Sequence, residues 1–136
     1  MAEVARHQLS ISSDVGDLAR LRRWLDARLQ PYALSDEVRN GLVVAVGELC
    51  VNSIRHAYAG EPIHPINVSV EDRGDALVIE VEDFGRRFDP QRYVPPDPDV
   101  VHEGGLGLYI VRQVADELSW DIARPAGTRW TVLKRL

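Results

Sequence analysis

Two early segments carry apolar residues at three- and four-residue steps, which is the spacing of one face of a helix. The first segment contains Val15, Leu18, Leu21, Leu25 and Leu29. Asp14 precedes this set and can accept hydrogen bonds from the free N–H groups at a helix start, and Pro31 ends the segment. The pattern predicts a helix that buries its leucine side.

The second segment begins at Ser35, another residue suited to capping a helix, and its first turn is acidic. The apolar stripe of this segment consists of Val38, Leu42, Val46 and Leu49. We expect the helix to run towards His56 and to stop near Gly60.

The remaining pattern predicts five short strands and one more helix. The strands are expected at residues 8–12, 66–70, 77–81, 120–123 and 128–136, with tight turns at 72–75 and 124–127. The helix follows Gly107 and has Leu108, Val111, Val114 and Leu118 as its expected core positions. Between residues 84 and 103 the pattern is lost and prolines gather, which is typical of a functional or mobile loop. Together these elements predict one α/β domain spanning residues 1–136, a two-layer sandwich whose mostly antiparallel sheet is covered on one face by helices.

Composition excludes several classes of function. The chain has 136 residues and a net charge of −5, which argues against non-specific binding to nucleic acid. No apolar run approaches the roughly 20 residues of a membrane span, and the first residues lack the apolar core of a signal peptide, so we expect a cytoplasmic protein without membrane contact. Cys50 is the only cysteine and is expected to be a small buried apolar residue. Lys134 is the only lysine, so neither a P-loop lysine nor the strand lysine of a eukaryotic-type protein kinase is present.

The first motif with candidate chemistry is Glu48 and Asn52, which lie four residues apart on the second predicted helix and so share one side of it. A solvated polar face would explain an isolated pair of this kind. Gly41 and Ala45 on the same side are small, however, which leaves room for a close neighbour. A carboxylate can take a proton from an attacking hydroxyl, and an amide oxygen is a hard ligand suited to Mg²⁺.

Two further motifs are weaker when each is taken alone. Asp83 and Gly85 follow a predicted strand, where they are typical of a turn but would also provide an acceptor for an exocyclic amine and room for a flat ring. The run Gly104-Gly-Leu-Gly-Leu108 opens the last predicted helix, where free N–H groups can bind phosphate oxygens or simply end a flexible loop.

In combination and in this order, the three motifs resemble those of the GHKL (Bergerat-fold) ATPases, and within them the small bacterial anti-sigma factor serine kinases. The matching blocks are residues 48–58, 81–90 and 104–116, together with Gly127-Thr128 in the closing strand. This resemblance extends over nearly the whole chain.

The resemblance implies a role for each motif residue. Glu48 would be the general base that activates an acceptor serine, and Asn52 would hold Mg²⁺ at the phosphates of ATP. Asp83 would recognise the adenine amino group, with a water shared by Thr128, and Gly85 would contact the nucleotide. The phosphates would be cradled by the glycine run at the start of the last helix, namely Gly104, Gly105, Gly107 and the adjoining Leu108. Residues 89–103 would form the ATP lid.

One position departs from the family pattern, because Arg87 stands where a second glycine is common. This arginine would alter lid hinging or nucleotide affinity, or would meet a phosphate or a partner. The resemblance also implies three kinds of protein partner: a sigma factor held inactive, a STAS-domain anti-anti-sigma protein phosphorylated on serine, and a second copy of the chain in a homodimer. Two alternatives stay open, a non-catalytic ATP-binding module that acts by sequestration and, ranked last, the catalytic domain of a sensor histidine kinase.

Overall fold

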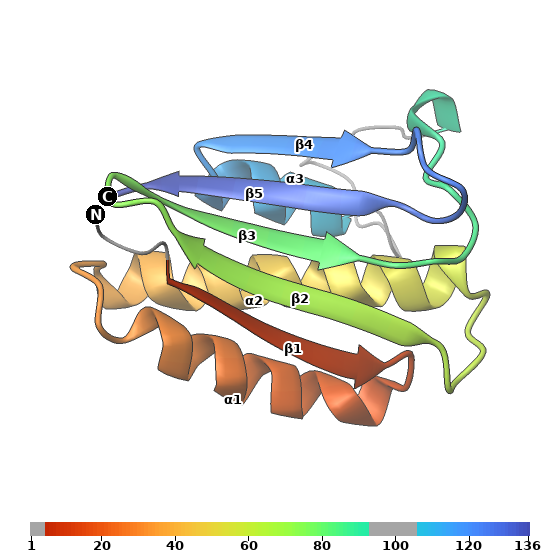
Figure 1. The fold of residues 1–136 in the computed structure, drawn as a ribbon, viewed down its shortest axis with the longest axis horizontal. Helices are drawn as coiled ribbons and strands as arrows, with labels where there is room; N and C mark the ends of the chain where they lie inside the picture. The colour runs from red at the N-terminus through yellow and green to blue at the C-terminus, as the bar shows by residue number, and fades with distance from the viewer. Residues whose placement is uncertain (1–4, 93–105) are drawn as a thin grey trace.

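In the computed structural model, which describes residues 5–92 and 106–136, one five-stranded sheet carries the α-helices on a single face (Figure 1). The strands are β1 (Arg6–Ser12), β2 (Pro65–Asp72), β3 (Ala76–Glu82), β4 (Glu117–Asp121) and β5 (Arg129–Arg135). The α-helices are α1 (Leu18–Leu29), α2 (Asp36–Asn52) and α3 (Leu106–Val114). Two short 3₁₀ turns, η1 (Val15–Asp17) and η3 (Pro90–Arg92), and a π-helical turn, η2 (Ser53–Ala57), complete the described elements. The predicted two-layer α/β sandwich is confirmed.

The strand order is β1-β2-β3-β5-β4, and every neighbouring pair is antiparallel. The alternation in β2 and β3 places Ile66, Val68, Leu77 and Ile79 fully inside, between the sheet and the helices. Trp130 of β5 is also buried, at 1% exposure. The main core cluster takes its buried side chains from β1, β2, β3 and β5 and from α1, α2 and α3, and it fills the space between the sheet and the helices.

Local signals set the start and end of α2 as the sequence predicts. The Ser35 hydroxyl accepts a 3.1 Å hydrogen bond from the backbone N–H of Val38, which caps the helix. After Asn52 the chain continues for one π-helical turn and then reverses at Gly60. The φ of Gly60 is 77°, a left-handed backbone conformation that glycine adopts without steric strain. The carboxyl end of this helix, the end of β3 and the start of β5 therefore lie at one end of the sheet (Figure 1).

Three predictions about the core and its boundaries were wrong. Val15 lies in η1 and is 68% exposed, because the capped first turn is 3₁₀ and the buried stripe of the helix begins at Leu18. Leu118 belongs to β4, because α3 ends at Val114 and Asp116 already donates its N–H to the carbonyl of Leu133 in β5. The fourth strand consequently begins three residues earlier than expected.

Cys50 is fully buried in α2, and burial raises the pKa of its thiol to about 12. This confirms the expected apolar role, because a thiol that stays protonated is a poor nucleophile and a poor metal ligand. No helix in the described part of the chain combines the length and the apolar character that crossing a bilayer requires.

Candidate functional site

Asp83 is the buried polar residue at the end of β3, and only 2% of its surface is exposed. Its Oδ2 accepts a 2.6 Å hydrogen bond from the hydroxyl of Ser53, and its Oδ1 accepts a 3.1 Å hydrogen bond from the backbone N–H of Thr128. The carboxylate thus joins the end of α2 to the start of β5. Each oxygen retains acceptor capacity beyond these bonds, because a carboxylate offers about four lone-pair sites.

Burial raises the pKa of Asp83 above its ordinary value of 3.8, since the charged form loses hydration. The hydrogen bond from Ser53, those from the N–H groups of Thr128 and Gly85, and the charge of Arg124 all act in the opposite direction. The site therefore holds an acceptor in a poorly hydrated environment. A ligand amine that donated to this acceptor would relieve part of the burial cost.

Gly85 lies directly against the turn that follows α2. A Cβ at this position would collide with the carbonyl of Ala57 and lie 2.8 Å from the ring of Tyr58. The next residue, Arg86, donates its N–H to the same Ala57 carbonyl at 2.9 Å. Within the described residues, Gly85 therefore allows its own backbone and the backbone at Ala57 to lie close together. A contact between Gly85 and a nucleotide remains a prediction.

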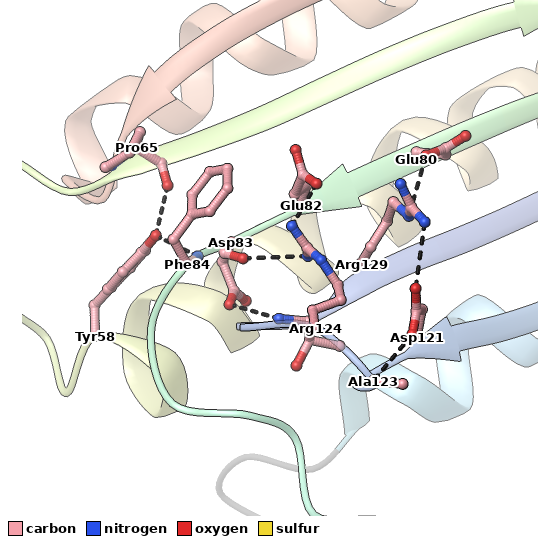
Figure 2. Close-up of polar contacts among 11 residues, drawn as sticks. Tyr58, Pro65, Glu80, Glu82, Asp83, Phe84, Asp121, Ala123, Arg124 and Arg129 are labelled. Carbon is pink, nitrogen blue, oxygen red and sulfur yellow. Dashed lines mark hydrogen bonds and ion pairs between the residues drawn. The ribbon is translucent and has the colours of Figure 1, made fainter. Parts of the chain in front are cut away.

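The hydroxyl of Tyr58 links the turn after α2 to the start of β2 and to the residue after Asp83 through hydrogen bonds (Figure 2). Its hydroxyl accepts a 2.8 Å hydrogen bond from the N–H of Phe84 and donates a 2.6 Å hydrogen bond to the carbonyl of Pro65. Phe84 directly follows Asp83, so the tyrosine also limits the movement of the buried carboxylate.

Thr128 is 1% exposed and makes contacts through both its backbone and its side chain. Its carbonyl accepts a 3.0 Å hydrogen bond from the N–H of Asp83, and its Oγ1 accepts a 2.9 Å hydrogen bond from the N–H of Phe88. The preceding Gly127 has a φ of 74°, and a Cβ there would collide with the Asp83 carbonyl. The hydroxyl proton of Thr128 can still be donated, as sharing a water with Asp83 would require.

Glu48 and Asn52 lie on the same side of α2 and are both partly buried. Asn52 immediately precedes Ser53, so the helix end that carries the amide is in direct contact with Asp83. Within residues 5–92 and 106–136, no hydrogen bond or ion pair involves the side chain of Glu48 or Asn52. Both are therefore able to take a new partner.

The small residues beside this pair have a structural explanation. A Cβ on Gly41 would lie 3.0 Å from a methyl of Val114, so α3 is the close neighbour for which the sequence leaves room. Ala45 is fully buried in the same region. The helix α3 is thereby packed against α2, the helix that carries Glu48 and Asn52.

Comparison with known proteins identifies the family. A model of the histidine kinase-like ATPase domain matches residues 11–134, nearly the whole chain. The chain belongs to this family. Its match includes Glu48, Asn52, Asp83 and Thr128, which the fold gathers at one end of α2 and the sheet.

Curated relatives that match this chain carry the name of serine-protein kinase RsbW. The chain is 32% identical over 92 residues to the serine-protein kinase RsbW of Listeria innocua, an alignment that covers 62% of this chain and 59% of that protein. It is 35% identical over 85 residues to the RsbW of Bacillus licheniformis, covering 57% and 53%, and 33% identical over 91 residues to that of Bacillus subtilis, covering 61% and 56%. The aligned part of the chain thus spans little more than half the length of these relatives.

The described residues contain no cluster of three His, Cys, Asp or Glu side chains that would hold a metal ion unaided. A Mg²⁺ ion that arrives with nucleotide phosphates needs only one or two protein ligands, because phosphate and water oxygens complete its octahedron. The partly buried amide of Asn52, without a partner among the described residues, fits that requirement.

Only part of the glycine run lies within the residues that the structure describes. Gly104 and Gly105 lie outside the described residues, as do residues 93–103 of the predicted lid. Gly107 lies in the first turn of α3, and Leu108 is 6% exposed in the core. A contact between Leu108 and a nucleotide would therefore have to come from its backbone.

Arg87, which departs from the family pattern, contacts the turn between β4 and β5. Its guanidinium donates to the carbonyl of Arg124 and, at 3.0 Å, to that of Pro125. Arg124 in turn forms a 2.5 Å ion pair with Glu82 and lies 5.5 Å over the ring of Phe84 (Figure 2). Among described residues, Arg87 therefore holds the turn whose Arg124 pairs with Glu82 at the end of β3.

Sequence reasoning missed Ser53, Tyr58 and Arg124. Ser53 and Tyr58 fall inside the block that begins at Glu48, so the polar side chain following Asn52 was the available signal. Arg124 lies in a turn with no motif, and its partner Glu82 is 42 residues away. No local pattern points to that pair.

Proposed function

We propose that this protein is a cytoplasmic, ATP-dependent serine-protein kinase that also acts as an anti-sigma factor. Its substrate would be a STAS-domain anti-anti-sigma protein, phosphorylated on serine, and its second partner would be a sigma factor held inactive. The single observation that carries the proposal is the contact between Ser53 and Asp83, which sets a buried acceptor beside the helix end bearing Asn52. The serine-protein kinase names of the relatives support the same reading.

In the proposed complex, Asp83 accepts a hydrogen bond from the exocyclic amine of adenine, and Thr128 shares a water with it. The amide oxygen of Asn52 is a ligand of Mg²⁺, which would neutralise charge on the phosphates. These contacts fix the two ends of the nucleotide relative to one helix. Positioning of this kind supplies much of the rate enhancement in phosphoryl transfer.

Glu48 would take the proton from the acceptor serine hydroxyl as the serine oxygen attacks the γ-phosphorus. The new bond joins serine oxygen to phosphorus, and the bond between phosphorus and the β–γ bridging oxygen breaks, so ADP leaves with the electron pair. Glu48 lies one helical turn before Asn52, so base and metal ligand face the same region. Nucleotide binding alone does not need this carboxylate, which favours a kinase over a sequestering module.

The test is phosphoryl transfer from γ-labelled ATP to purified STAS-domain proteins of the same genome. We expect acid-stable label on a serine of at least one of them. ATP binding without phosphoserine in any partner would favour the non-catalytic module, and acid-labile label would favour a histidine kinase domain. Absence of ATP binding would overturn all three readings.

A further inference from the structure

After Asn40, the outward side of α2 carries apolar residues where a surface helix is normally polar. From Gly41 to Ile54, Glu48 is the only charged residue, although part of this stretch faces away from the core. Val44 is 48% exposed and Val51 is partly exposed. A helix with apolar residues on its solvent side calls for a second partner to cover them.

The outward side of α1, the neighbouring helix, shows the contrast. Its exposed positions include Arg20, Arg22 and Arg23, as expected for a helix that meets water on that side. The apolar character of the α2 surface is therefore a local feature and not a property of the whole helical layer.

This surface borders Glu48. Val44 precedes Glu48 by four residues and Val51 follows it by three, so both side chains adjoin the carboxylate on the helix. Gly47 lies between the two valines, and the nearest atom to a Cβ built there would be Nε of Arg22, at 3.4 Å. Gly47 is itself buried, so the side chain of Arg22 covers the backbone of α2 at this point and lies next to the two valines.

Two cations flank the valines. Arg22 stands on the α1 side and Arg55 one turn beyond Val51, and both are exposed. Neither forms an ion pair with another described residue, whereas Arg39, Arg124 and Arg129 all do. On a chain of net charge −5, the surface made of Arg22, Val44, Val51 and Arg55, named here the α2 patch, offers apolar contact between positive charges.

We propose that the α2 patch is the docking surface for the protein that carries the acceptor serine, and that it receives an apolar side chain between carboxylates. The inference rests on the proposed kinase function. A serine hydroxyl must come within about 3 Å of its base, and a folded partner that does so covers roughly 800 Å² of the surrounding surface. The α2 patch is the apolar surface next to Glu48, and its two exposed arginines favour a partner with acidic side chains.

The experiment compares Val44→Glu and Arg55→Glu with two matched controls, Val15→Glu and Arg23→Glu. Val15 is 68% exposed and lies in η1, and Arg23 is an exposed arginine of α1 that does not border Gly47. The measured quantities are the KM for the STAS-domain protein that the wild type phosphorylates, kcat, and the Kd for ATP. We expect the KM to rise about tenfold or more in both patch variants, with the Kd for ATP unchanged and both controls like wild type.

A KM unchanged in both patch variants, or raised equally in the controls, would overturn the docking surface while leaving the kinase function standing. Loss of sigma-factor binding without a change in this KM would also overturn it, because the patch would then serve another partner. A wild-type chain that phosphorylates no STAS-domain protein would overturn the proposed function and the docking surface with it. Reversal of a partner carboxylate to arginine should restore the KM of Arg55→Glu and would confirm direct pairing.

Discussion

The hydroxyl of Ser53 donates a 2.6 Å hydrogen bond to Oδ2 of Asp83, thirty residues further along the chain. This bond connects the turn that ends α2 with the residue that ends β3. Both side chains are buried, at 1% and 2% exposure, so water does not compete for it. It is the contact through which the helix carrying Glu48 and Asn52 is placed beside the proposed adenine acceptor.

Replacing Ser53 with alanine should weaken ATP binding about tenfold, because a buried hydrogen bond to a charged group is worth about 1.5–3 kcal/mol. The loss should grow as pH falls, since Asp83 without this donor holds its proton to a higher pH and a protonated carboxyl is a poorer acceptor. Calorimetric titration with ATP at several pH values measures both effects. Ser119→Ala, at an exposed position of β4, is the control, and a pH profile parallel to wild type would contradict the assignment.

Replacing Asp83 with asparagine should make the free energy of unfolding less sensitive to pH. Burial raises the pKa of Asp83 in the folded chain, so its contribution to stability is present at low pH and is lost as pH rises from 3.8 through the raised value. The substituted asparagine has no such titration, because its amide stays neutral. The stability of the wild type should therefore fall relative to Asp83→Asn across that interval and level off above it.

Urea unfolding of both proteins between about pH 3 and pH 8 provides this measurement. A difference that stays constant, or that moves in favour of the wild type as pH rises, would show that burial does not dominate the titration of Asp83. The same variant should lose ATP affinity by about tenfold or more, because one of its acceptors becomes a donor.

Alanine at Glu48 and alanine at Asn52 should have different consequences. Glu48→Ala should keep the Kd for Mg·ATP and lower kcat for phosphoryl transfer by 10²-fold or more, roughly the loss expected for a general base. Asn52→Ala should raise the Kd for Mg·ATP and have little effect on ATP binding when Mg²⁺ is chelated. Equal loss of nucleotide affinity in both variants would be inconsistent with these roles.

Alanine at Gly85 should destabilise the fold, because its Cβ would collide with the backbone carbonyl of Ala57, which is held by Arg86 N–H. Overpacking of this kind lowers the free energy of unfolding by about 1–3 kcal/mol. Denaturant unfolding gives the value. Gly16→Ala is the control, since a Cβ there meets only the Asp14 side chain at 3.4 Å, and an equal effect at the two glycines would argue against the clash.

Much of the fold could be predicted because its signals are local. Alternation in β2 and β3 identifies the buried face of each strand, and the Ser35 hydroxyl that caps α2 acts on a residue three positions away. The order of the blocks that begin at Glu48, Val81 and Gly104 is likewise visible in the chain, and it indicated the ATPase family that the comparison identifies.

The predictions that were wrong lie at the ends of α1 and α3, where the helical spacing of apolar residues extends beyond the helix itself. Leu118 continues the helical spacing of α3 but belongs to β4, because its backbone pairs with Val132 of the neighbouring strand β5. Val15 fits the periodicity of α1 but lies in the 3₁₀ turn before it, and the buried stripe of the helix begins at Leu18.

The sequence alone therefore determined the elements, their buried faces and the residue types available for nucleotide chemistry, since these depend on spacings of two to four residues. Only the tertiary structure decided that Ser53 holds Asp83, that Arg87 braces the turn at Arg124, and that α3 fills the space beside Gly41. Such contacts join residues thirty or more positions apart, and they arise from how helices and strands pack, which no short stretch of the chain encodes.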